Sequence, residues 1–118
     1  MSKEELKTRF KKFALRIMKL ANSLPYKNRG KLIGDQIFRA GTSSASNYRA
    51  ATRARSNDEF ISKLCIVEEE LDECMFWMET IIESGLMEEK LVKPLYYEAN
   101  ELLSITISSK KTVKNKLN

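Results

Sequence analysis

The chain has 118 residues and a formal net charge of +5, from 21 Lys and Arg against 16 Asp and Glu. Its length fits one domain, and 42% hydrophobic with 31% charged residues is typical of a folded chain rather than a disordered one. With only four Gly and two Pro, an all-β sandwich or barrel is not expected. The absence of His excludes His-based acid–base catalysis and His-containing metal sites.

The charges are divided along the chain. Residues 1–55 hold 14 basic and 3 acidic side chains, residues 56–109 hold 3 basic and 13 acidic ones, and residues 110–118 hold four lysines. A basic half favours contact with phosphates, because Lys and Arg displace the counterions of a polyanion. Oppositely charged halves equally favour pairing within the molecule or head-to-tail self-association. Both interpretations remain open.

Two helices are predicted in the basic half. Ser2 and Glu5 form a capping-box pattern, which starts a helix that ends before Pro25. Its apolar residues recur at spacings of three and four: Leu6, Phe10, Phe13, Ile17, Leu20 and Leu24. After a polar connection to Gly30, the second stripe comprises Leu32, Ile33, Ile37, Ala40, Ser44, Tyr48 and Ala51. Residues 40–46 are poor helix formers, which we interpret as the cost of a close contact between helices.

A third helix is predicted in the acidic half. Ser56 and Glu59 repeat the capping-box pattern, and Gly85 is suited to the C-terminal cap. Between them runs a heptad seam: Phe60, Leu64, Val67, Leu71, Cys74, Met78 and Ile81. Cys65 and Cys74 fall on opposite sides of this helix, so they cannot bridge each other, and we interpret both as small core thiols.

The fourth predicted helix covers about residues 87–109 and contains Pro94. Either a short turn precedes a helix that begins near Lys93, or one helix is kinked at the proline. Its apolar residues are Leu95, Ala99, Leu102, Leu103, Ile105 and Thr106. Four such segments with short connections predict an all-α fold, an antiparallel up-and-down four-helix bundle. We expect residues 1–109 to form this domain and residues 110–118 to form a flexible basic tail.

A row of polar residues lies on the second predicted helix, and a row that contains two carboxylates lies beside the seam of the third. The rows are Gln36, Arg39, Ser43 and Asn47, and Ile66, Glu70, Glu73 and Trp77. A hydrogen-bonded network between them, with Arg39 on a glutamate, would fix the register of the two helices. Ordinary solvated positions are the alternative. Carboxylates at i, i+3 on one helix offer no substrate cleft, so no catalytic residue is predicted.

The sequence gives no sign of a membrane segment, a metal site or a cofactor. No run of 18 apolar residues exists, and the segment Met1–Glu5 lacks the apolar stretch of a secretory signal. We therefore expect a cytoplasmic protein that does not contact a membrane and is not an enzyme.

Several short motifs recur together along the chain. They are Gln36-Ile37-Phe38-Arg39-Ala40-Gly41-Thr42-Ser43, Asn47-Tyr48-Arg49, Arg53-Ala54-Arg55-Ser56, Phe60, Lys63-Leu64, Glu70, Glu73, Trp77 and Glu83-Ser84-Gly85-Leu86. With these motifs the chain resembles the 23S rRNA intervening-sequence protein family, small bundle proteins encoded within insertions in bacterial ribosomal RNA genes or elsewhere in genomes. The segment Leu20–Pro25 also resembles the end of the family's first helix.

The resemblance implies a ring-shaped homopentamer, and related bundle proteins act as nucleic-acid-binding accessories of diversity-generating retroelements. It also favours a defined polar constellation of Arg39, Ser43, Asn47, Glu70 and Glu73. The family usually places Glu three residues after the Asn, where this chain has Ala50. A network that used that acid must here be reduced or rebuilt from the two glutamates of the third helix.

Two functions are consistent with these observations. The first is a non-enzymatic protein that associates with RNA or other nucleic acid through basic surfaces. The candidate cations are Lys7, Lys11, Lys12, Arg16, Lys27, Arg29, Lys31, Lys110 and Lys111, with Lys114 and Lys116 in the tail. The alternative is a homo-oligomeric protein-interaction scaffold without nucleic-acid binding, whose charges serve assembly. Steep salt dependence of binding would distinguish the first from the second.

Overall fold

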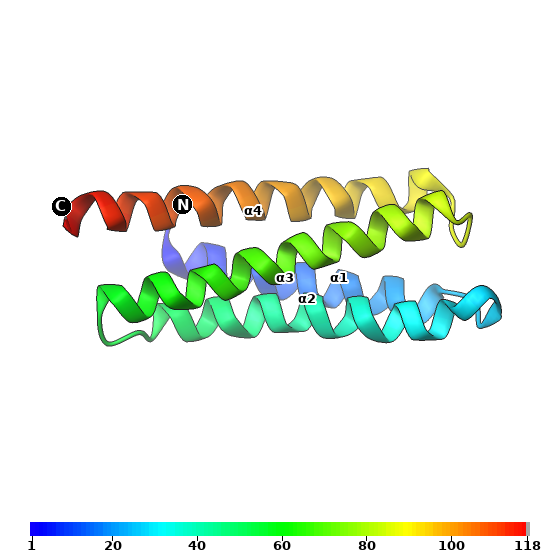
Figure 1. Cartoon of the computed structure of the whole chain (residues 1–118), viewed down its shortest axis with the longest axis horizontal. Helices are drawn as coiled ribbons and strands as arrows, with labels where there is room; N and C mark the ends of the chain where they lie inside the picture. Colours follow the sequence, from blue (N-terminus) through cyan, green and yellow to red (C-terminus); the bar gives the residue numbers. More distant parts are fainter. Residues whose placement is uncertain (118) are drawn as a thin grey trace.

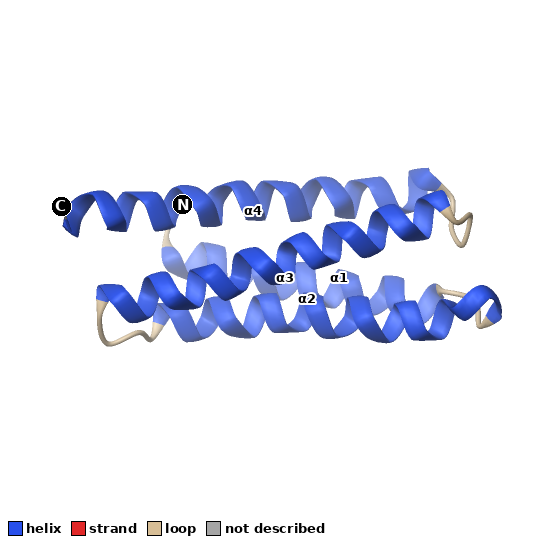
Figure 2. Cartoon of the chain, in the orientation of Figure 1, coloured by secondary structure: helices blue, strands red, loops and turns tan. Residues whose placement is uncertain are grey.

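The computed structural model describes residues 1–117 and folds them into four α-helices with principal extents of 50 × 20 × 19 Å. Successive helices run in opposite directions, so α1 begins and α4 ends at the same end of the bundle (Figure 1). The elements are α1 (Lys3–Ser23), the 3₁₀ turn η1 (Lys27–Arg29), α2 (Gly30–Thr52), α3 (Asn57–Glu83) and α4 (Glu89–Leu117). The described residues contain no strand (Figure 2), which confirms the predicted all-α class. Within residues 1–117, no helix is apolar enough over sufficient length to cross a membrane.

The helix ends follow the predicted caps. The Ser2 hydroxyl accepts a hydrogen bond from the Glu5 backbone N–H at 3.0 Å, and the Ser56 hydroxyl accepts one from the Glu59 N–H at 3.1 Å. These hydroxyls satisfy N–H groups that have no partner within the first turn of a helix. After α3, Gly85 adopts φ +77°, a left-handed conformation that a residue without Cβ adopts at little cost.

The apolar stripes of the four helices meet in one core. Every residue of the predicted α3 seam is buried: Phe60, Leu64, Val67, Leu71, Cys74, Met78 and Ile81. The rings of Phe10 on α1 and Tyr48 on α2 stack with centroids 4.7 Å apart. Leu32 is 51% exposed, contrary to the predicted stripe, because it lies about 140° around the helix from Ile37.

Helices α1 and α2 approach each other closely at Gly41. A Cβ atom at this position would lie 2.6 Å from Cγ2 of Ile17 and 2.9 Å from its Cβ, closer than real carbon atoms come. The Ser44 hydroxyl, which is buried nearby, donates to the Gly41 carbonyl at 2.7 Å. The low helix propensity of residues 40–46 therefore accompanies a close helix contact, as the sequence indicated.

The structure decides between the two alternatives for the start of α4 and differs from the expectation at its end. One helix begins at Glu89 and contains Pro94 in its second turn, where the missing N–H costs one backbone hydrogen bond near the helix start. The segment expected to be a flexible basic tail instead continues α4 through residue 117. Val113 packs against the core there, which gives this last part of the helix tertiary support.

Candidate functional site

An ion-pair network joins α2 to α3 on one side of the bundle. Arg39 donates from Nη1 to Oε2 of Glu70 at 2.9 Å and from Nη2 to both carboxylate oxygens of Glu73 at 2.7 and 2.6 Å. The indole N–H of Trp77 donates to Oε2 of Glu73 at 3.1 Å. The guanidinium thus bridges two carboxylates that lie one turn apart on α3, and one positive charge is shared between two negative ones.

The network is smaller than the predicted row of polar residues. Asn47 does not reach α3, because its side-chain amide donates to the Ser43 carbonyl at 2.9 Å and to the Ser43 hydroxyl at 3.1 Å. Gln36 makes no side-chain hydrogen bond to another described residue. Both glutamates bound by Arg39 come from α3, so the ion pair forms without an acid at position 50.

The electrostatics of this network are those of a permanent ion pair between two helices. The hydrogen bonds that Arg39 donates to Glu73 and to Glu70 raise the pKa of its guanidinium, so its positive charge stays fixed. The Glu70 side chain is only 13% exposed, whereas that of Arg39 is 51% exposed. One arginine beside two glutamates leaves no excess of positive charge with which to attract an external anion.

Other cations of the chain are also paired with its own carboxylates. Three of the predicted nucleic-acid contacts form ion pairs: Lys7 with Glu4, Lys31 with Asp35, and Lys110 with Glu68. Arg9 was not among the predicted site residues. Its guanidinium donates two hydrogen bonds to the Glu98 carboxylate of α4, from Nε to Oε2 at 2.8 Å and from Nη2 to Oε1 at 2.7 Å. That bidentate pair raises the pKa of Arg9 and connects the first helix to the last.

The two cysteines have different surroundings. Cys74 lies in the core, where burial raises the pKa of its thiol and keeps it protonated. Cys65 is only partly buried, and its Sγ accepts a hydrogen bond from Lys110 Nζ at 3.7 Å. The expectation of two core thiols therefore holds for Cys74 and is wrong for Cys65.

A groove with a cavity volume of about 440 Å³ lies between α1 and α2. Eleven residues line it: Lys7, Thr8, Lys11, Ala14, Leu15, Met18, Thr42, Ala45, Ser46, Arg49 and Arg53. Four of these residues are basic and none is acidic, in contrast to the network on α3. Among the described residues, Lys7 alone of the four forms an ion pair, with the exposed Glu4.

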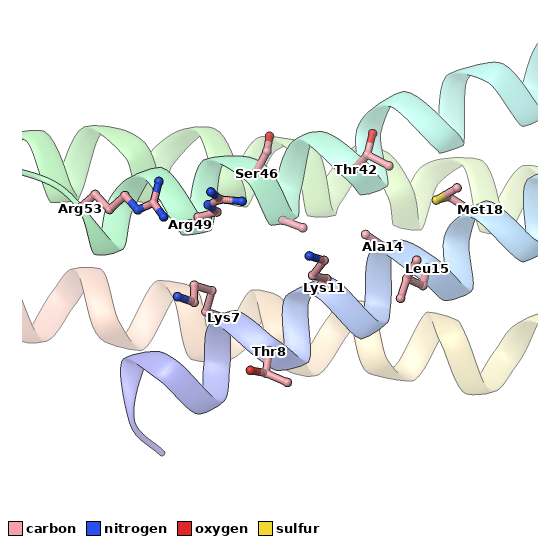
Figure 3. A pocket seen from close by; sticks show the side chains of 11 residues that line it. Lys7, Thr8, Lys11, Ala14, Leu15, Met18, Thr42, Ser46, Arg49 and Arg53 are labelled. Carbon is pink, nitrogen blue, oxygen red and sulfur yellow. The ribbon is translucent and has the colours of Figure 1, made fainter.

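The groove changes character along its length. Lys7 and Lys11 of α1 lie at the same end as Arg49 and Arg53 of α2, because the two helices are antiparallel (Figure 3). The opposite end is formed by apolar side chains of α1, chiefly Leu15 and Met18, together with Thr42 of α2 (Figure 3). One end of the groove therefore suits an anion, and the other suits an apolar surface.

Only part of this groove was predicted from the sequence. Lys7 and Lys11 were among the predicted phosphate contacts, but Arg49 and Arg53 were not, although Thr42, Ser46, Arg49 and Arg53 recur at spacings of four, three and four along α2 and its C-cap. That spacing was available as a signal. The remaining cations of the prediction are exposed and lie outside the groove: Lys12, Arg16, Lys27, Arg29 and Lys111.

Fold and groove together define a small all-α bundle protein with a basic cleft between its first two helices. The chain belongs to the 23S rRNA-intervening sequence protein family, because residues 3–108 match the sequence pattern of that family. It is also similar to a crystal structure of a protein of unknown function from the S23 ribosomal protein family of Bacteroides thetaiotaomicron VPI-5482. That similarity has 30% identity and a TM-score of 0.87, over 94% of this chain and 99% of the other. No curated protein matches the chain.

Proposed function

We propose that the protein is a non-enzymatic nucleic-acid-binding protein that holds the phosphate backbone of RNA in the groove between α1 and α2. The observation that carries this proposal is a concave surface lined by four cations and no acid. Elsewhere Arg9, Arg39 and Lys110 are bound by carboxylates of the chain itself. The groove is thus a surface on which cations remain available to phosphates.

The groove chemistry suits a backbone better than a base sequence. Arg49 and Arg53 offer planar forks to phosphate oxygens, and Lys11 offers a point charge. No aromatic side chain lines the groove, so recognition of particular bases is not proposed. We propose RNA as the polyanion to test first because the family's name refers to a 23S rRNA intervening sequence.

A non-enzymatic role is proposed from the chemistry of the side chains. The sequence has no His to act as a base near neutral pH. The groove offers no carboxylate or thiol as an alternative. Within residues 1–117, no group of acidic or cysteine side chains is arranged to hold a metal ion.

The test is RNA binding by the purified chain as a function of salt. Fluorescence anisotropy of a labelled RNA strand of mixed sequence gives the Kd. If the four groove cations neutralise four phosphates of a single strand, the Kd should rise about 50-fold between about 50 and about 200 mM salt. If no RNA or DNA shows a salt-sensitive change in anisotropy with the chain at low ionic strength, the proposal is wrong.

A homo-oligomeric scaffold is the second candidate function. Large apolar side chains on α2 and α3 are exposed around the Arg39 network, with Phe38 at 40%, Ile66 at 38% and Phe76 at 56%. Such residues are typical of the edge of a protein interface. We propose a ring of copies of this chain, with five as the number implied by the family resemblance, which would display several grooves together and increase avidity.

Light scattering tests this assembly. A mass of several protomers that falls to the protomer mass when Phe76→Ser is introduced would support it, because Phe76 is the most exposed of these side chains. A strictly monomeric chain at every concentration would contradict it. RNA binding by a monomer would leave the first function in place and remove only the ring.

A further inference from the structure

The two ends of the α1–α2 groove differ in chemistry, and this difference restricts the kind of nucleic acid that the groove can hold. Building on the proposed function, we infer that the groove takes a single-stranded segment of RNA. Its phosphates contact the basic end, and an unpaired base packs on the apolar end formed by Leu15 and Met18. The basic end is lined by Lys7, Lys11, Arg49 and Arg53.

The apolar end has the composition of a packing surface for a base. The Leu15 side chain is 56% exposed although it faces a concave site, and Met18 beside it is partly buried. A flexible, polarisable thioether adapts well to the flat face of an aromatic ring. Ala14 and Ala45 border the same site and leave space above it because their side chains are short.

Hydroxyl oxygens at the rim distinguish a base from a purely apolar ligand. Thr42 donates its hydroxyl hydrogen to the Phe38 carbonyl at 2.8 Å, and Ser46 donates its own to the Ser43 carbonyl at 3.2 Å. Their hydrogens are thereby used, and their oxygens remain acceptors. A base carries amino and imino hydrogens that these oxygens accept, whereas an acyl chain carries none.

The geometry of the groove favours a single strand over a duplex. A volume of about 440 Å³ is that of a small-molecule pocket, confined between two adjacent helices. A duplex keeps its bases stacked inside and presents only phosphates and sugars to such a site. It would contact the basic end and leave Leu15 and Met18 exposed to water. Only an unpaired nucleotide reaches both ends at once.

The experiment compares three labelled probes with the full chain at low salt. They are a single-stranded RNA, the same strand annealed to its complement, and a strand of equal length with abasic sites. The abasic strand retains the phosphates and lacks the bases. We expect the chain to bind the single strand about tenfold more tightly than the abasic strand, a value near the lower end of the range for stacking on an aromatic side chain, because Leu15 and Met18 lack an aromatic face. The duplex should bind as weakly as the abasic strand when compared per phosphate.

A variant of the apolar end and a control variant elsewhere on the surface test whether the bases pack on Leu15 and Met18. Leu15→Ser with Met18→Ser should weaken binding of the single strand about tenfold, to the affinity of the abasic strand, and leave abasic binding unchanged. Leu91→Ser is the control, since Leu91 on α4 is 58% exposed and lies outside the groove. It should leave the affinity for all three probes unchanged. Circular dichroism establishes that the variants remain helical.

The possible results separate this inference from the function on which it rests. If Leu15→Ser with Met18→Ser has no effect, or the duplex binds as tightly as the single strand, the inference fails while phosphate binding stands. If no nucleic-acid probe binds, both fail. Binding of anionic phospholipid vesicles in place of RNA, abolished by the same two substitutions, would also overturn both and assign the groove to a lipid.

Discussion

The two arginine-bearing surfaces of α2 differ in what the neighbouring helix supplies. On the α3 side, Arg39 meets Glu70 and Glu73 and its charge is cancelled. On the α1 side, Arg49 and Arg53 meet lysines, and their charges add to those of the neighbour. Arginines on one helix thus serve two purposes, because a side chain's function depends on the charges that packing brings against it.

This difference also explains why net charge is a poor guide to the binding surface. Residues 1–55 carry most of the cations, yet several of these are paired with acids from the second half of the chain or from their own helix. Intramolecular pairing and phosphate binding, which the sequence left as alternatives, can coexist because they involve different surfaces. The first is observed at Arg9 and Arg39, and the second is proposed for the α1–α2 groove.

Charge reversal in the groove gives the largest expected effect. Lys11→Glu with Arg49→Glu removes two phosphate contacts and introduces repulsion, so RNA affinity should fall roughly 100-fold if each charged contact contributes about 1.5 kcal/mol. The matched control is Lys12→Glu with Arg16→Glu, an equal charge change at exposed positions of α1 outside the groove. Anisotropy at low salt measures both. Equal losses in the two variants would mean that RNA senses the overall charge and not the groove.

The next effect concerns the close contact between α1 and α2 at Gly41. Gly41→Ala places a methyl group 2.6 Å from Cγ2 of Ile17, and both atoms lie between α1 and α2. We expect the free energy of unfolding to fall by about 1–3 kcal/mol, although Ala favours a helix by about 1 kcal/mol over Gly. Urea denaturation measures the loss. Adding Ile17→Ala should make the two effects non-additive, because it creates space for the methyl group; strict additivity would contradict the clash.

Much of this architecture could be predicted from the sequence because local chemistry determines it. Ser2 and Ser56 cap their helices through their own side chains, and Gly85 ends α3 in a conformation that suits it. The α3 seam is buried because its residues share one side of a helix that must cover apolar surface. In each case, the residues that decide the structure lie within a few positions of one another.

The polar contacts were harder to predict, since they depend on which helices become neighbours. Periodicity placed Asn47 on the same row as Arg39, but it could not tell that the Asn47 amide would bond to its own helix. It also could not tell that Lys110 would meet Glu68 and belong to the helix rather than to a tail. Arg49 and Arg53 were missed for a related reason, because their significance arises from the lysines of α1 across the groove.

The smallest effect is expected at the compensated surface. Arg39→Met keeps the length of the side chain but leaves Glu70, which is 13% exposed, beside Glu73 without its cation. The free energy of unfolding should fall by only about 1 kcal/mol, because Arg39 itself is half exposed and water screens part of the pair. Lys31→Met breaks the fully solvated pair with Asp35 and should cost less, about 0.3 kcal/mol. Urea denaturation at low salt compares the two.

The Kd of the Arg39→Met protein for RNA should lie within about twofold of that of the unchanged chain. The positive charge of Arg39 is already paired with the two glutamates, so its loss removes no contact with phosphate. A loss of RNA affinity as large as that from reversing Lys11 and Arg49 would show that Arg39 contacts the ligand, and the distinction between the two surfaces would fail. If Arg39→Met leaves both the free energy of unfolding and the mass in solution unchanged, the network stabilises neither the bundle nor its assembly. Because the ion pair is partly exposed, raising the salt concentration should reduce the stability difference between the two chains, as screening weakens the attraction that the substitution removes.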